Sequence, residues 1–210
     1  MLRKGEVRIN KGRAKPGYRL VAGDVVRLPP VRLPTQQVSA VPRAVLDRLS
    51  ASVLFEDDHL LVLNKPSGLA VHAGSGLAFG VIEALRILRP ELDFLELGHR
   101  LDRETSGCLL LAKNRQQLLE LHQAMRDGAI QKTYITLLAG QWQGGDREVE
   151  LELSAHGDAR DGRGKMQVSD EGKSSRTVFA LLANFSDDCL MSVGLYTGRT
   201  HQIRVHAESI

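Results

Sequence analysis

The sequence has few cysteines and no long hydrophobic segment. Its two cysteines, Cys108 and Cys189, form no CxxC pair, which argues against a disulfide-stapled fold and favours two reduced core thiols. The longest purely apolar runs are residues 60–63 and 108–112, whereas a membrane-spanning helix needs roughly 18 or more apolar residues. The first six residues lack the apolar stretch of a secretory signal. These absences predict a cytoplasmic protein that has no membrane partner.

The composition is that of an ordinary globular protein, but its charge is uneven. Of the 210 residues, 42% are hydrophobic and 25% are charged, which suits one domain with a small companion. Residues 1–47 hold ten Lys or Arg and three Asp or Glu, a net charge of +7; the remaining residues hold 18 and 22, a net of −4. Such a basic block suits a polyanion such as nucleic acid, or it is a solvated surface with no partner.

The distribution of strand patterns and prolines along the chain predicts two parts joined by a linker. Residues 7–10 and 24–28 have strand patterns, and four prolines with polar spacers follow within residues 29–43. We therefore expect a small basic module at 1–30, a linker at 31–47 and a larger domain at 48–210. Helical spacing in that domain covers residues 79–88 and 115–126. Strand patterns cover residues 52–56, 59–64, 107–113, 132–139, 148–153, 163–168, 175–182 and 190–195, which predicts an α+β fold.

The common nucleotide-binding and hydrolytic motifs are missing. The sequence contains no GxxxxGK[ST], no GxGxxG after a strand, no GxSxG and no HExxH. His201 and His206 are five positions apart, which does not fit the spacing of a helical metal pair. We therefore predict no metal site.

Two polar segments are the candidates for chemistry. Residues 99–107 read HRLDRETSG and residues 197–206 read TGRTHQIRVH. The first could equally be a charged surface loop, whose ion pairs contribute little. The second could be an N-capped helix with solvated arginines; if it is helical, Thr200, His201 and Arg204 share a face.

Together, four segments resemble the RluA-type pseudouridine synthases. Residues 99–113 (HRLDRETSGCLLLAK) are similar to the signature of that family. Residues 64–72 (NKPSGLAVH), 131–134 (QKTY) and 198–206 (GRTHQIRVH) are similar to its other motifs and come in the same order. The resemblance covers about residues 48–210. Residues 3–10 and 23–26 are similar to the second half of an S4 RNA-binding domain. The catalytic match stops at residues 206–210, whereas in the family further strands and helices follow, so the resemblance implies a chain shortened at both ends.

The resemblance implies a fold and a reaction. The fold is a mixed, mostly antiparallel β-sheet catalytic domain with flanking helices, preceded by a partial S4-like α/β RNA-binding module. The reaction breaks the N1–C1′ bond of a uridine and rejoins the ribose through C5, without a cofactor. Asp102 takes the role of the nucleophile at C1′, and Arg204, or alternatively Arg199, orients that carboxylate. Tyr134 stacks on the base and helps to remove the C5 proton, although a tyrosine on a strand is also an ordinary core residue.

The resemblance also implies an RNA partner, most simply 23S ribosomal RNA, and a monomer. Arg100 fills the space that the extruded nucleotide leaves, or holds that nucleotide. Further RNA contacts are expected from Arg103, Lys132 and Arg199, and salt-sensitive contacts from Lys4, Arg8, Lys11, Arg13 and Lys15. The alternatives are a synthase that acts on tRNA or another rRNA site, and an RNA-binding protein without catalysis.

Overall fold

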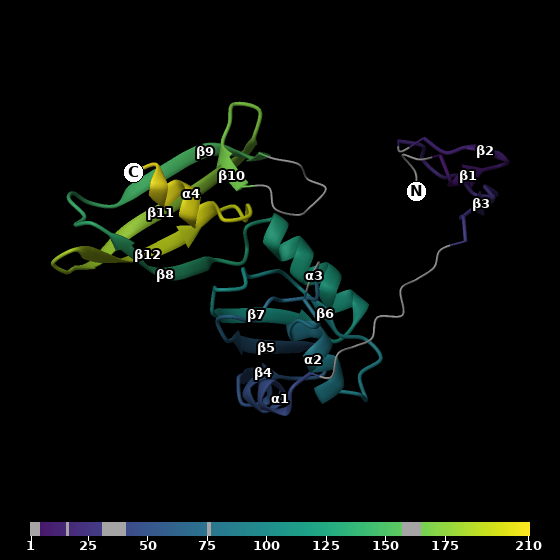
Figure 1. The fold of residues 1–210 in the computed structure, drawn as a ribbon, viewed down its shortest axis with the longest axis horizontal. Helices are drawn as coiled ribbons and strands as arrows, with labels where there is room; N and C mark the ends of the chain where they lie inside the picture. The colour runs from purple at the N-terminus through teal and green to yellow at the C-terminus, as the bar shows by residue number, and fades with distance from the viewer. Residues whose placement is uncertain (1–4, 16, 31–40, 75–76, 157–164) are drawn as a thin grey trace. The chain divides into compact units, whose positions relative to one another are not determined.

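The computed structural model describes residues 5–15, 17–30, 41–74, 77–156 and 165–210 (Figure 1). The chain divides into two units, Met1–Val38 (unit 1) and Ser39–Ile210 (unit 2). Among the described helices, none has both the length and the apolar character needed to cross a bilayer.

Unit 1 contains a small antiparallel sheet. Its strands are β1 (Arg8–Ile9), β2 (Gly12–Arg13) and β3 (Val26–Arg27), in the order β2-β1-β3. Asn10 and Lys11 both have positive φ angles, which two-residue hairpin turns require. The Asn10 side chain also accepts from the amide of Val25 at 3.0 Å, so it joins the turn to β3. The strands expected within residues 7–10 and 24–28 are confirmed.

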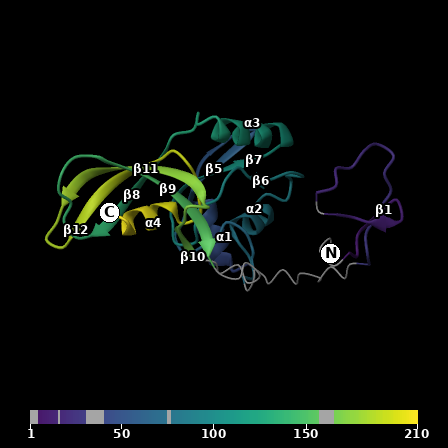
Figure 2. The ribbon, with the colours of Figure 1, turned by 90° about the horizontal axis from the view of Figure 1, so that it is seen from above.

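The first sheet of unit 2 has the order β4-β5-β7-β6. Its strands are β4 (Val53–Glu56), β5 (Leu60–Lys65), β6 (Glu96–Leu97) and β7 (Gly107–Ala112). Helices α1 (Arg43–Ser50) and α2 (Val81–Leu88) cover one face, and α3 (Arg115–Arg126) lies on the other (Figure 2). The core between the sheet and the first two helices includes the fully buried Leu61, Leu63, Leu109 and Leu111.

The second sheet of unit 2 has the order β10-β9-β11-β12-β8. Its strands are β8 (Lys132–Ala139), β9 (Arg147–His156), β10 (Lys165–Val168), β11 (Lys173–Asn184) and β12 (Asp188–Leu195). The short helix α4 (Gln202–Glu208) packs on one face through Ile203 and Ala207, over a core that includes Phe179 and Met191. Every strand pair in the described residues is antiparallel, and the α+β fold is confirmed.

Two elements of unit 2 differ from the expectation. Helix α1 begins at Arg43, inside the range 31–47 that the prolines mark as a linker, and residues 31–40 of that range lie outside the described residues. Pro42 precedes the helix, where proline does not interrupt helical hydrogen bonds, and Leu49 is buried in the core. Strand β6 has two residues, too few for an alternating pattern.

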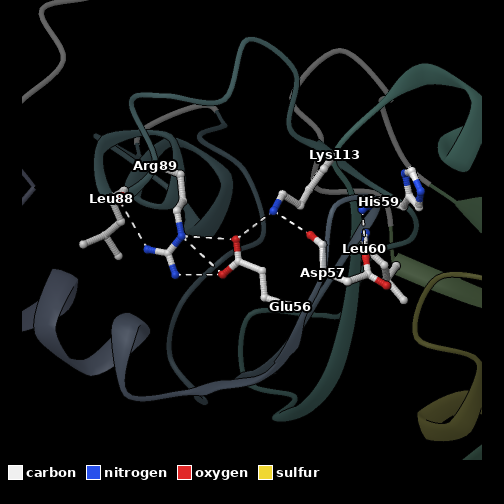
Figure 3. A network of polar contacts seen from close by, with 7 residues as sticks. All are labelled: Glu56, Asp57, His59, Leu60, Leu88, Arg89 and Lys113. Atoms are coloured by element: carbon white, nitrogen blue, oxygen red, sulfur yellow. Dashed lines mark hydrogen bonds and ion pairs between the residues drawn. The ribbon is translucent and has the colours of Figure 1, made fainter.

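A charged network joins β4, α2 and the end of β7 (Figure 3). The Glu56 carboxylate accepts from Arg89 Nη2 at 2.9 Å and from Lys113 Nζ at 3.2 Å. Lys113 Nζ also donates to the carbonyl of Asp57 at 2.6 Å. Hydrogen bonds from Arg89 hold the pKa of Glu56 below its ordinary value, and the Lys113 ammonium acts in the same direction. The network therefore fixes the end of β7 that is opposite to loop 98–106.

Replacing Glu56 with Gln should lower the free energy of unfolding at pH 7 by about 1–3 kcal/mol, because two partly buried cations lose their shared carboxylate. Since folding lowers the pKa of Glu56, its contribution is present above the ordinary glutamate value and is lost as the pH falls through the folded value. Urea unfolding at pH 7 and at about pH 4 measures both effects. The control Glu96→Gln, in an exposed pair with Arg86, should cost less than about 1 kcal/mol; equal losses would contradict the prediction.

Candidate active site

The buried Lys65 ammonium joins two of the four predicted motif segments. Lys65 ends β5 and is fully buried. Its Nζ donates to three carbonyls, those of Pro66 at 3.0 Å, Leu69 at 2.8 Å and Arg103 at 3.1 Å. Burial lowers the pKa of Lys65, while the carboxylates of Glu104 and Asp102 oppose that shift. One cation thus anchors both the 66–69 turn and the loop that carries Asp102.

Further hydrogen bonds join the same two loops directly. The amide of Gly68 donates to the carbonyl of Arg103 at 2.9 Å, and Arg103 Nε donates back to the carbonyl of Gly68 at 3.0 Å. Ser67 Oγ donates to the carbonyl of Glu104 at 2.8 Å. Gly68 has a φ of +90°, a conformation that glycine adopts without the cost of a Cβ. The Arg103 side chain, predicted to contact RNA, therefore also stabilises the loop.

His99 fixes the beginning of the Asp102 loop. Its Nε2 accepts from the amide of Leu110 at 3.1 Å, so the proton lies on Nδ1, which is 3.4 Å from the carbonyl of Arg100. Burial lowers the pKa of His99, and the nearby Lys132 charge adds to the effect. The imidazole is thus a neutral structural group that ties the loop to β7.

Asp102 lies between these anchors, in loop 98–106 before β7. Its carbonyl accepts from the amide of Thr105 at 3.1 Å, and 25% of its side chain is exposed. The backbone is held on both sides, while the carboxylate still faces solvent. This combination gives a fixed anion that a substrate can reach.

Tyr134 contributes a ring to the same region from the second sheet. It lies on β8 opposite Val193 and packs against the cores of both sheets. Burial raises the pKa of its hydroxyl, and the negative charge of Asp102 raises it further. The Asp102 charge therefore acts on the Tyr134 hydroxyl, although the two residues come from segments far apart in the sequence.

Buried Gln202 anchors the beginning of α4. Its Oε1 accepts from Thr197 Oγ1 at 2.8 Å and from the amide of Arg199 at 3.0 Å. Its Nε2 donates to the carbonyl of Arg176 at 3.0 Å and to Thr177 Oγ1 at 2.9 Å. All the hydrogen-bonding capacity of this side chain is thus directed at β11 and at the turn before α4.

His206 holds the other end of α4 on β11. Its Nε2 lies 2.8 Å from Ser175 Oγ, and that hydroxyl donates to the carbonyl of Leu151 at 2.6 Å. Nε2 therefore donates to Ser175, and Nδ1 is buried with no partner among the described residues. Burial lowers the pKa of His206, which favours this neutral form. Gln202 and His206 thus fix both ends of α4 on β11.

The side chain that approaches the Asp102 carboxylate in space is that of His201, to which the motif resemblance gives no role. His201 Nε2 lies 3.7 Å from Asp102 Oδ2. The described ion pairs join Asp102 to neither Arg204 nor Arg199, so the expected arginine partner stays a prediction. Arg204 is exposed on α4, and Arg199 Nε donates to the carbonyl of Ser174 at 3.0 Å. Gln202 anchors the turn before α4, and this turn directs His201 toward loop 98–106. The side chains of α4 itself are not directed there.

The remaining predicted RNA contacts fall into two groups. In unit 2, Arg100 is exposed, and burial lowers the pKa of Lys132, which is on the same side of β8 as Tyr134. The others are in unit 1, where Arg8, Lys11, Arg13 and Lys15 are exposed and Lys4 lies outside the described residues. In the described part of the chain, no three His, Cys, Asp or Glu residues are grouped as a metal site.

Replacing Lys65 with Met should lower the free energy of unfolding by at least about 2 kcal/mol, since each buried acceptor left unsatisfied costs about 1–3 kcal/mol. The amide of Gly68 should also exchange its hydrogen faster. Urea unfolding and hydrogen exchange measure the two effects. Lys173→Met, at an exposed position of β11, is the control and should change neither. Slow exchange at Gly68 in the Lys65 variant would contradict this role.

The comparisons with known proteins give the family of the chain. Residues 59–209 match the family described as RNA pseudouridylate synthase, and the chain belongs to that family. It is 53% identical over 210 residues to a ribosomal large subunit pseudouridine synthase C of Yersinia pestis, covering 99% of this chain and 65% of that protein. It is 51% identical to the protein of the same name in Escherichia coli strain K12, covering 66% of it. The chain thus spans slightly less than two thirds of these relatives.

Solved structures show the same fold. The human RNA pseudouridylate synthase domain containing 4 aligns with a TM-score of 0.66 and 25% identity, over 79% of this chain and 67% of that one. The human RNA pseudouridylate synthase domain containing 1 aligns with a TM-score of 0.63 at 22% identity, which supports the fold alone.

Proposed function

We propose that this protein isomerises specific uridines of 23S ribosomal RNA to pseudouridine, as a monomer in the cytoplasm. The observation that carries the proposal is Asp102, a partly exposed carboxylate on a loop anchored by Lys65, whose charge raises the pKa of the Tyr134 hydroxyl. Membership of the RNA pseudouridylate synthase family supplies the reaction. The names of the relatives, which specify the large ribosomal subunit, supply the substrate.

The reaction needs an anion at the sugar. The N1–C1′ bond breaks, and the electron pair stays on the uracil while positive charge develops at C1′. Asp102 attacks C1′ or stabilises that charge, as glycosidase carboxylates do. The base then turns, C5 bonds to C1′, the C5 proton leaves and N1 gains a proton. Atoms and electrons balance without a co-reactant, so the proposal includes no cofactor.

Tyr134 supplies a surface on which the uracil can turn. An aromatic ring stacks on either face of a pyrimidine without fixing it by directional hydrogen bonds. Its hydroxyl, with a pKa raised by burial and by Asp102, remains protonated at neutral pH. The proposal therefore gives Tyr134 first a stacking role and then a proton-relay role at C5.

A uridine in folded RNA has to leave its stack to reach Asp102. Arg100, exposed and two positions before Asp102, occupies the vacated space or stacks on the extruded nucleotide. Arg103, Lys132 and Arg199 contact the phosphates of the same strand. Arg204, exposed on α4, pairs with the Asp102 carboxylate once RNA is bound.

Replacing Asp102 with Asn should abolish isomerisation while leaving RNA affinity nearly unchanged, because the amide keeps the shape of the side chain but cannot stabilise C1′. The substrate is a 23S rRNA transcript of Escherichia coli with tritium at C5 of its uridines, and tritium release measures the reaction. We expect at least about a 10³-fold loss of rate, the scale of removing a reacting group. Filter binding to the same transcript measures affinity.

Three outcomes would contradict parts of this proposal. Activity in Asp102→Asn would overturn the role of Asp102. A wild-type chain that releases tritium only from tRNA would replace 23S rRNA by tRNA as the substrate. A wild-type chain that binds both RNAs and releases tritium from neither would leave the binding-only alternative. Glu104→Gln, with an exposed carboxylate in the same loop, is the matched control and should retain activity.

We further propose that unit 1 is an S4-like RNA-binding module. Its exposed cations should release counterions from RNA on binding. Replacing Lys11 and Arg13 with Gln should weaken binding at low salt and reduce the slope of log K against log salt by up to about 2, since each cation neutralises one phosphate. Replacing Arg126 and Arg43 in unit 2 with Gln is the control, because both are exposed but lie outside the motif segments. Equal changes in slope would contradict a specific role for unit 1.

A further inference from the structure

We propose that His201 is a positioning residue that holds the Asp102 carboxylate in its reactive orientation. The inference rests on the proposed function and deepens it, because it assigns a role at the same site to a residue to which the motif resemblance gives none. Two observations carry it: the approach of His201 Nε2 to Asp102 Oδ2 at 3.7 Å, and the backbone conformation that makes this approach.

The backbone of His201 is held in an uncommon conformation. Its φ of 53° and ψ of 22° lie in the left-handed region, which costs a residue with a Cβ about 1–2 kcal/mol. The surroundings maintain it: the carbonyl of His201 accepts from the amide of Val205 at 3.1 Å, and the amide of Gln202 donates to the carbonyl of Arg199 at 3.2 Å. Because the side chain of Gln202 is fixed on β11, the imidazole of His201 is directed toward loop 98–106.

The contact links the two sheets of unit 2 at the reacting group. Asp102 comes from the loop before β7 of the first sheet, whereas His201 comes from the turn between β12 of the second sheet and α4. Lys65 anchors the backbone of the Asp102 loop from beneath, and His201 contacts the carboxylate itself. The proposal therefore assigns the position of the loop to Lys65 and the rotation of the Asp102 side chain to His201.

His201 contacts one carboxylate oxygen. It approaches Oδ2, which leaves Oδ1 to face C1′ of the ribose. Asp102 and His201 have side chains that are 25% and 44% exposed, so the pair is accessible to the RNA that would cover it. Once RNA excludes water, the interaction between imidazole and carboxylate strengthens, because the local dielectric constant falls.

The test separates positioning from RNA binding by comparing kcat with KM. His201→Asn removes the imidazole but tolerates the left-handed backbone, and His201→Gly does so without strain. On the tritiated 23S rRNA transcript, we expect kcat to fall about ten- to hundred-fold in both, the effect of a small misplacement of a reacting group, with KM unchanged. Added imidazole should restore part of the kcat of His201→Gly.

A matched control and an independent check complete the test. His122→Asn changes a half-buried histidine on α3 and should keep the kcat of the wild type. Thermal unfolding should give a melting temperature for His201→Gly that is no lower than that of the wild type, so a loss of kcat would not reflect unfolding. A wild-type kcat in His201→Asn and His201→Gly, or a change in KM alone, overturns the assignment and leaves the proposed function intact. A wild-type chain without tritium release overturns both.

Discussion

The candidate site depends on one buried cation. Placing the Lys65 ammonium in the interior is unfavourable, and it is tolerated because three carbonyls accept hydrogen bonds from it. Two of those carbonyls belong to the turn after β5, and the third belongs to Arg103, thirty-eight positions away from Lys65. The same interaction that satisfies the cation thus brings the loop of Asp102 against the turn. No apolar residue at this position could fix two loops in this way.

The second constraint is that the site is built across two sheets. The first sheet supplies the loop of Asp102, and the second supplies Tyr134 and the turn before α4. Tyr134 packs against both cores, so the ring is held where the sheets meet. In the proposed reaction the two sheets contribute different parts: the first provides the anion, and the second provides the groups that contact the base and orient the anion. Changes in either core should therefore reach the chemistry.

Much of this architecture can be predicted from sequence patterns. The helix at Arg115–Arg126 and the strand at Lys132–Ala139 have the predicted bounds, because their apolar spacing is regular. Helix α1 could not be found, since nearby prolines mask it. The sequence does indicate the burial of Lys65, because this residue follows Leu61 and Leu63 at alternate positions of a strand and its side chain therefore faces the core. The motif sequence alone does not predict which side chain of residues 198–206 approaches Asp102. That choice depends on the φ of His201 and on the anchoring of Gln202, which are tertiary properties.

The electrostatics of the site follow from its two anchors. A carboxylate that reacts at C1′ has to remain ionised when RNA displaces water, and desolvation opposes this. Lys65 supplies a positive charge near the loop, but its N–H groups are directed at carbonyls, so it acts on the Asp102 carboxylate without contacting it. His201 lies on the exposed side and acts at Oδ2 directly. In the proposed site, the buried Lys65 charge therefore acts on the Asp102 carboxylate from a distance, and the exposed His201 imidazole orients it.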